Sequence, residues 1–135
     1  MNFESYIEKG IKENLGFKEA LDIVKANSLK GRIFAAGGFV YRTIVQGLYG
    51  VKSDEIFDFD FIVENPVDSD MIKLPHDWDL RTTHHGDSRF INGIKQIDLF
   101  PINHAVLPSD YDRTHEMSLD EKLNSYFRRA CLNMQ

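Results

Sequence analysis

The chain has 135 residues, of which 42% are hydrophobic and 27% are charged, the composition of a single soluble globular domain. Its 16 basic and 21 acidic residues give a formal net charge of -5 with no basic run, which excludes strong binding of long nucleic acids by charge alone. A single cysteine, Cys131, excludes an internal disulfide framework, and no apolar stretch is long enough to cross a bilayer, so we expect a cytoplasmic protein without a membrane partner.

Residues 1–30 are predicted to be helical. Apolar side chains recur at helical spacing on both sides of Gly16, where we expect one helix to end and the next to begin. These apolar positions are Phe3, Tyr6, Ile7, Ile11, Leu21, Ile23, Val24 and Leu29. Residues 31–36 then form a short apolar run that predicts a buried strand, so the core of the domain is expected to span residues 31–135.

A glycine pair follows this strand and precedes a second helical segment. Gly37 and Gly38 end the strand, and residues 39–45 have apolar positions suited to a buried helix. Gly47 and Gly50 are predicted to close that helix, because glycine readily adopts the backbone conformation found after a helix end.

Strand-like runs dominate the middle of the chain. Residues 56–63 alternate strictly, which predicts a strand with Phe57, Phe59, Phe61 and Val63 on one face and Asp58, Asp60 and Ile62 on the other. A polar loop over residues 64–77 leads to another short strand over residues 78–83. Two further runs, 88–91 and 94–100, are joined by Asn92-Gly93, the preferred central pair of a type I′ hairpin turn.

The chain is predicted to end in a loop and a helix. Residues 101–117 contain prolines and several acidic residues and are expected to be a loop, with residues 103–116 placed to act as a lid. Ser118 and Glu121 form a capping-box pattern that opens the last helix. The order of helices and strands predicts one α+β domain with a mixed β-sheet and helices packed against it, spanning residues 1–135.

Three carboxylates form the candidate site. Asp58 and Asp60 leave the same face of one predicted strand, and Asp98 lies on the second strand of the hairpin between apolar neighbours. Aspartate is disfavoured in strands, and like charges side by side repel each other unless a cation lies between them. Mg²⁺, or Mn²⁺ in its place, is a hard cation that prefers such oxygen ligands. If the two strands are neighbours, the three carboxylates converge on a shared metal site. Alternatively, Asp58 and Asp60 are the solvated half of an amphipathic strand.

The glycine pair offers a second half to this site. Glycines between a strand and a helix let a ligand approach the backbone closely, and the first N–H groups of the helix point at an anion. Phosphate oxygens fit such a position, although the same glycines also make an ordinary tight turn. Arg42, one helical turn further on, is the best candidate for a triphosphate contact, ahead of Arg89 and Lys95 beside the hairpin turn.

In combination, these motifs resemble the nucleotidyltransferase superfamily of the DNA polymerase β type. They are most similar to the head domain of the tRNA CCA-adding enzymes and bacterial poly(A) polymerases. Residues 37–42 resemble the family's glycine-pair motif, Asp58-Phe59-Asp60 its Asp-x-Asp strand, and Asp98 its later carboxylate. Residues 128–133 resemble a degraded form of its last motif, so the likeness spans about residues 31–133. Tyr41 and Arg42 stand where the family has Arg and Asp, and the neck and body that hold tRNA have no counterpart.

The resemblance implies an enzyme that transfers a nucleoside monophosphate from a nucleoside triphosphate to an acceptor hydroxyl with two Mg²⁺ ions. It assigns catalysis and metal binding to Asp58, Asp60 and Asp98, and nucleotide binding to Gly37, Gly38 and Arg42. The acceptor is RNA, a protein or a small molecule, and the residues do not decide between them. Two alternatives stay open. One is an inactive or weak domain that binds nucleotide or a protein partner in the manner of an antitoxin, and the other is a metal-dependent phosphohydrolase.

Overall fold

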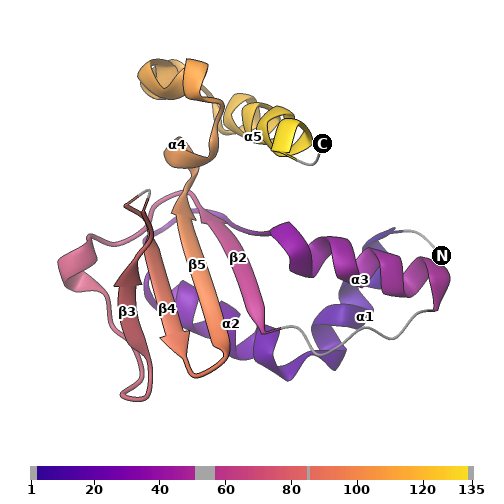
Figure 1. Ribbon diagram of the computed structural model, residues 1–135. Coiled ribbons are helices and arrows are strands. Elements are labelled where there is room, and N and C mark those ends of the chain that lie inside the picture. Colours follow the sequence, from indigo (N-terminus) through magenta and orange to yellow (C-terminus); the bar gives the residue numbers. More distant parts are fainter. Residues whose placement is uncertain (1–2, 51–56, 85, 134–135) are drawn as a thin grey trace.

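A five-stranded mixed sheet forms the centre of the computed structural model, which describes residues 3–50, 57–84 and 86–133 (Figure 1). The strand order is β1-β2-β5-β4-β3, where β2 and β5 run parallel and the other neighbouring pairs run antiparallel. The strands are β1 (Ile33–Ala36), β2 (Asp58–Val63), β3 (Asp79–Thr82), β4 (Ser88–Asn92) and β5 (Lys95–Pro101). The predicted class, α+β with a mixed sheet, is confirmed.

Helix α2 covers one face of this sheet, and α4 and α5 cover part of the other. In Figure 1, α2 lies against one face, α1 and α3 pack together beside the sheet, and α4 and α5 lie beyond the end of β5. The helices are α1 (Phe3–Glu13), α2 (Leu15–Ala26), α3 (Gly37–Tyr49), α4 (Ile102–Ala105) and α5 (Leu119–Asn133), with 3₁₀ segments at Ser69–Met71 and Pro108–Glu116. Among the described residues, we find no helix with the length and apolar character needed to pass through a lipid bilayer.

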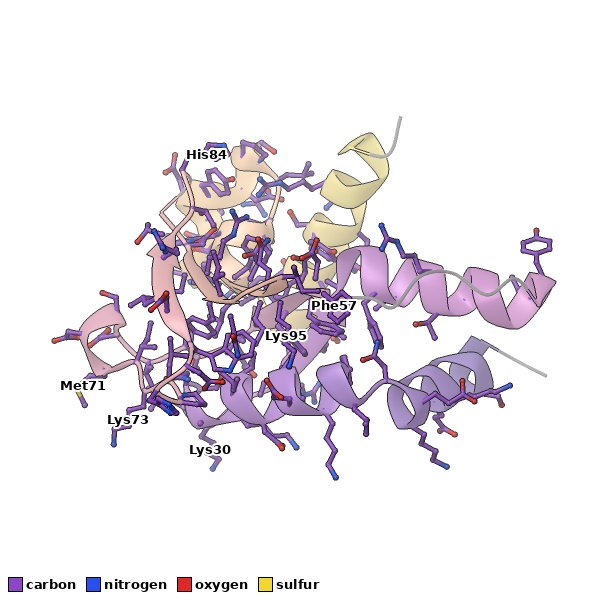
Figure 2. The ribbon with its side chains drawn as sticks, turned by 60° about the horizontal axis from the view of Figure 1, so that its bottom comes forward. Lys30, Phe57, Met71, Lys73, His84 and Lys95 are labelled. Atoms are coloured by element: carbon purple, nitrogen blue, oxygen red, sulfur yellow. The ribbon has the colours of Figure 1, made fainter. Side chains whose placement is uncertain are left out.

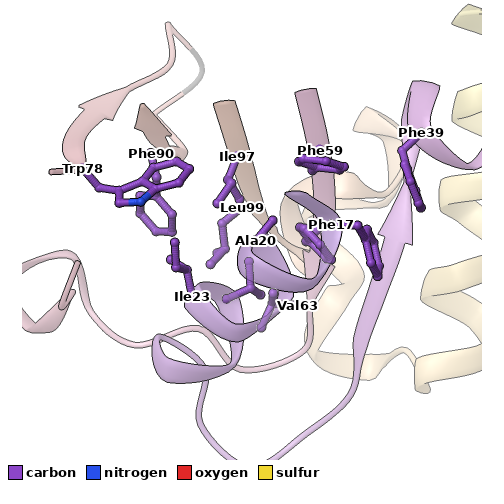
Figure 3. Close-up of a cluster of buried hydrophobic side chains, with 12 residues drawn as sticks. Phe17, Ala20, Ile23, Phe39, Phe59, Val63, Trp78, Phe90, Ile97 and Leu99 are labelled. Carbon is purple, nitrogen blue, oxygen red and sulfur yellow. The ribbon is translucent and has the colours of Figure 1, made fainter. Parts of the chain in front are cut away.

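The larger hydrophobic core lies between α2 and the sheet (Figure 3). Phe17 of α2 stacks on Phe39 of α3 with ring centroids 4.5 Å apart, and both rings contact Phe59 of β2. Each such buried aromatic side chain stabilises the fold by roughly 1.5–3 kcal/mol. The complete cluster of buried hydrophobic residues contains Phe17, Ala20, Ile23, Val24, Phe39, Phe59, Phe61, Val63, Trp78, Phe90, Ile97 and Leu99. Helix α2 and the sheet therefore share one core.

The opposite face of the sheet is only partly covered. A smaller cluster joins Ile62 of β2 to Ile102 and Ala105 of α4, and partly buried side chains of α5 pack against it. These side chains are Leu119, Leu123 and Tyr126. Helices α4 and α5 cover the end of this face near Ile62. Polar residues of β2, β5 and β4 lie on the rest of it.

The predicted break between the first two helices is displaced by two residues. Asn14, and not Gly16, separates α1 from α2. The side-chain oxygen of Asn14 accepts a hydrogen bond from the backbone N–H of Phe17 at 3.0 Å, so Asn14 is the N-cap of α2. Capping satisfies an N–H group that has no partner inside the helix, and this outweighs the weaker signal of a glycine.

The hairpin forms as predicted, but its turn is shifted by one residue. Gly93 and Ile94 form the two-residue loop, and Asn92 pairs with Lys95 in the ladder. Gly93 has a φ of 60°, and no described non-glycine residue has a positive φ, which is the pattern of a type II′ turn and not of type I′. This changes the pairing of the two strands by two positions, so that Arg89 lies opposite Asp98.

The segment predicted as loop after β5 is largely helical, as α4 and the second 3₁₀ segment show. Its anchor is Asp110, a buried residue whose carboxylate accepts a 2.6 Å hydrogen bond from the hydroxyl of Ser125 in α5. This buried contact ties the segment to α5, which does not suit the predicted lid. The capping box at Ser118 and Glu121 is confirmed, since each residue's side chain accepts a hydrogen bond from the other's backbone N–H.

Other boundaries differ little from the sequence prediction. Helix α3 continues through Gly47 and ends at Tyr49, and Gly50 follows with a φ of 63°. Residue 56, the predicted start of the Asp58 strand, lies outside the described residues. Phe57 is described and half-buried, and its carbonyl accepts a hydrogen bond from Gln96 N at 2.9 Å. Figure 2 shows Phe57 and Lys95 where β2 and β5 begin.

Candidate active site

The parallel pairing of β2 and β5 brings the predicted carboxylates together. Asp60 lies directly opposite Asp98, and Asp58 lies opposite Gln96. Directly paired residues of neighbouring strands project to the same face, about 4.8 Å apart across the ladder. Asp58, Asp60 and Asp98 therefore occupy one face of the sheet, which we call the carboxylate face. Of the three, Asp98 is buried, Asp60 is half-buried and Asp58 is exposed.

A line of charged residues crosses the sheet through Asp60 and Asp98. From the β3 edge inward, Arg81 pairs with Arg89, and Arg89 pairs with Asp98. Beyond Asp98 come Asp60 and then Ala36, the last residue of β1. Two arginines and two aspartates thus stand in sequence on the carboxylate face, with the positive half on β3 and β4.

Arg89 neutralises the third carboxylate. Its Nε donates to Asp98 Oδ1 at 2.7 Å and its Nη2 donates to Asp98 Oδ2 at 3.0 Å, so the pair is bidentate. The amide of Gln96 donates a longer, 3.5 Å hydrogen bond to the same Oδ2. The hydrogen bond to Asp98 is the main cause that raises the pKa of the Arg89 guanidinium above its ordinary value, and the charges of the aspartates add to it.

Among the described side chains, Asp60 forms no ion pair like that between Asp98 and Arg89. Its pKa is raised from 3.8 to about 6, first because burial disfavours its charge, and then because Asp98 and Asp58 repel it. Arg89 offsets only part of this. Tyr126 of α5 lies near enough for the charge of Asp60 to raise its pKa, after the larger effect of its own burial.

Gly37 makes room for Asp60. It is the first residue of α3 and has a φ of 69°, in the left-handed region that favours glycine. A Cβ atom at this position would collide with Oδ2 of Asp60. By contrast, a Cβ atom at Gly38 would meet no atom within 4 Å. The start of α3 therefore lies directly against the Asp60 carboxylate, and Gly38 leaves an open space beside it.

Three other basic residues belong to the motifs found in the sequence, and two of them contact other parts of the protein. Arg42 is exposed on α3, and among the described side chains it forms no hydrogen bond or ion pair with the three aspartates. Lys95 belongs to the opposite face of the hairpin, where its Nζ lies 3.6 Å from a carboxylate oxygen of Glu19 in α2. Arg129, in the degraded last motif, donates to the carbonyl oxygens of His104 and Val106 and so holds the α4 turn.

The carboxylate face suits a divalent cation in donor type and charge, but the ligands are not gathered into a closed set. Within the described part of the chain, no three His, Cys, Asp or Glu side chains stand close enough to hold a metal ion as they are. Arg89 instead engages both oxygens of Asp98. Burial, followed by the repulsion from Asp98 and Asp58, raises the pKa of Asp60, and a cation beside these carboxylates would balance their negative charge. Carboxylate oxygens are the donor type that Mg²⁺ or Mn²⁺ prefers.

Alternation along the strand already places Gln96 on the face of Asp98, but the sequence patterns did not predict that Arg89 pairs with Asp98 or that Tyr126 lies near Asp60. A hairpin turn centred on Gly93 and Ile94 is the signal that would have placed Arg89 opposite Asp98, since the turn sets the pairing of both strands. No local signal places Tyr126 near Asp60, because α5 reaches the sheet only through the tertiary packing.

No protein-family model, no curated protein and no solved structure matches the chain.

The charge of Asp60 should make the fold less stable at neutral pH. We expect Asp60→Asn to raise the free energy of unfolding at pH 8 by roughly 1–2 kcal/mol, which is less than the full pKa shift implies because solvent screens this partly exposed group. The folded protein binds the proton of Asp60 more tightly than the unfolded chain does. Wild-type stability should therefore rise as the pH falls through about 6 towards 3.8, and the advantage of the variant should shrink over this window. Urea denaturation at pH 8, 6 and 4 measures it, and an advantage that is independent of pH would contradict the assignment.

Proposed function

We propose that the protein is a metal-dependent nucleotidyltransferase that uses the carboxylate face to transfer a nucleoside monophosphate to an acceptor hydroxyl. The observation that carries the proposal is the position of Asp60, directly opposite Asp98 on a parallel strand and against the first turn of α3 at Gly37. This arrangement places two carboxylates and a set of helix N–H groups around one spot. Carboxylates favour a cation there, and N–H groups favour an anion, which together describe a metal–phosphate ligand.

Each residue has a separate task in the proposed reaction. Asp58 and Asp60 hold the metal-bound triphosphate in place, and the backbone at Gly37 and Gly38 cradles its terminal phosphates. When bound, divalent metal ions supply charge neutralisation at the reacting phosphate and at the leaving oxygens. Asp98 accepts the proton of the acceptor hydroxyl, whose oxygen forms the new bond to the α-phosphorus as the bond to pyrophosphate breaks.

Binding measurements test the first half of the proposal. We expect isothermal titration calorimetry to show that an ATP analogue with a non-cleavable α,β-methylene bridge binds in the presence of Mn²⁺ and not without it. Asp58→Ala should abolish this binding. Asp79→Ala is the matched control, because Asp79 is an exposed aspartate on the same face of the sheet. It lies on β3 in the same cross-strand row as Asp58, separated from it by Ile91 and Gln96. A wild-type protein that binds no nucleotide would eliminate the proposal, and an Asp58→Ala variant that binds normally would place the nucleotide elsewhere.

Isotope position tests the reaction class. ATP labelled at the α-phosphate should leave its label on an acceptor, while ATP labelled at the γ-phosphate should release labelled pyrophosphate. Release of inorganic phosphate instead would support a phosphohydrolase that uses the same aspartates.

A second candidate, a binding domain without catalysis, draws on the bond between Arg89 and Asp98. Arg89 donates hydrogen bonds to both oxygens of Asp98 and so balances the charge of this carboxylate without a metal. In that case the protein binds nucleotide or a protein partner, and neither labelled product appears.

A further inference from the structure

Arg89 and a divalent cation need the same atoms. The guanidinium engages Oδ1 and Oδ2 of Asp98, and the Asp98 side chain is only 8% exposed, so water has little access to these oxygens. A cation shared between Asp60 and Asp98 would bind at least one of the same two oxygens, next to the positive charge of the guanidinium. Because a divalent cation and a guanidinium repel each other at such short range, the metal and the arginine compete for Asp98.

The Arg89 side chain has room to turn away from Asp98, because 35% of it is exposed. It lies beside Arg81, its direct partner on the edge strand β3. Like charges directly opposite each other on neighbouring strands repel. In the present arrangement Asp98 balances one of the two positive charges, and Arg81 is exposed. A second anion placed over this face would find two guanidinium groups next to the carboxylates.

We propose that Arg89 is a positioning residue with two partners: it holds Asp98 in the metal-free protein and turns to a phosphate group of the nucleotide when a cation takes Asp98. This inference rests on the proposed function. The planar fork of a guanidinium matches phosphate oxygens as well as carboxylate oxygens, so the exchange replaces one bidentate contact by another. Arg81 contributes positive charge on the same side, which favours the phosphate-bound position of Arg89.

The exchange predicts opposite changes in two affinities when Arg89 is replaced. Without nucleotide, Arg89→Gln should bind Mn²⁺ about tenfold more tightly than wild type, because Asp98 is no longer occupied. With Mn²⁺ at saturation, the same variant should bind the non-cleavable ATP analogue about tenfold more weakly, because the phosphate loses its arginine. Calorimetry measures both quantities. For each affinity, Arg89→Lys should give a value between those of wild type and Arg89→Gln, because lysine keeps the charge and loses the bidentate geometry.

Lys95→Gln is the matched control, because Lys95 lies on the same hairpin and faces α2. It should leave both affinities unchanged. A thermal melt adds a measurement that does not depend on nucleotide: Arg89→Gln leaves Asp98 buried without its partner, so Mn²⁺ should raise its melting temperature more than that of wild type.

The outcomes separate this inference from the function on which it rests. If wild type binds Mn²⁺ and nucleotide but Arg89→Gln changes neither affinity, or weakens Mn²⁺ binding, the exchange is wrong and the proposed function stands. If Mn²⁺ binding tightens while nucleotide binding is unaffected, Arg89 guards Asp98 but does not hold the phosphate, which overturns the second role. If wild type binds neither ligand, the function and the exchange fail together.

Discussion

Asp60→Asn should lower the rate of nucleotidyl transfer about 1,000-fold, because a metal-binding carboxylate is worth several kcal/mol in the transition state. Asp98→Asn should have an effect of similar size, since it removes the oxygen ligand and the proton acceptor together. The transfer of label from α-labelled ATP, measured over time, gives both rates. The Asp60 variant is informative in a second way, because the same change is expected to stabilise the fold at pH 8. A loss of activity with a gain in stability excludes unfolding as the cause.

Asp79→Asn controls for the general loss of a negative charge on this face. Asp79 lies at the β3 edge, three strands or about 14 Å from β2 at the usual strand spacing. Its replacement should change the rate less than twofold. An Asp60→Asn variant that keeps most of its activity, or that loses no more than Asp79→Asn, would show that the carboxylate face is not the reaction centre.

Gly37→Ala should destabilise the protein by about 2 kcal/mol and abolish nucleotide binding. The first reason is the backbone: a φ of 69° costs an alanine about 1–2 kcal/mol relative to glycine. The second reason is the collision of the new Cβ with Oδ2 of Asp60, which forces the carboxylate away from its position opposite Asp98. Urea denaturation measures the first effect, and calorimetry with Mn²⁺ and the ATP analogue measures the second.

Gly38→Ala is the matched control, one residue further along the same helix. Its added Cβ would have no atom within 4 Å, and its φ is not positive. Because alanine is the better helix former, this variant should be as stable as wild type or more stable by up to about 1 kcal/mol. Equal losses of stability in both variants would mean that the helix start, and not the contact with Asp60, limits what position 37 tolerates.

The parts of the fold that local patterns encode were predictable from the sequence. The strict alternation over residues 57–63 places Phe59 and Asp60 on opposite faces of a strand, and β2 has this arrangement. The capping box at Ser118 likewise marks the start of α5. These features depend on neighbours within a few positions, where the periods of strands and helices determine which side chains share a face.

The predictions that were wrong involve a choice between competing local signals. Asn92-Gly93 has the composition of a type I′ turn. In the structure, however, Gly93 is the first of the two central residues of a type II′ turn, and the ladder extends to Asn92. The acidic, proline-containing segment after β5 reads as a loop, yet the buried contact between Asp110 and Ser125 folds it against α5. In both cases, contacts with the rest of the protein selected one of two locally acceptable conformations.

The sequence by itself determined which residue types reach the carboxylate face: Asp58 and Asp60 by alternation along one strand, and Asp98 by its place between apolar neighbours. Only the tertiary structure decided that β5 runs parallel to β2 with Asp60 opposite Asp98, and that Arg89 occupies the latter. The physical reason is distance along the chain. Pairing between strands 38 residues apart is decided by the packing of the whole sheet. The raised pKa of Asp60 depends in turn on the burial and charges that this packing creates.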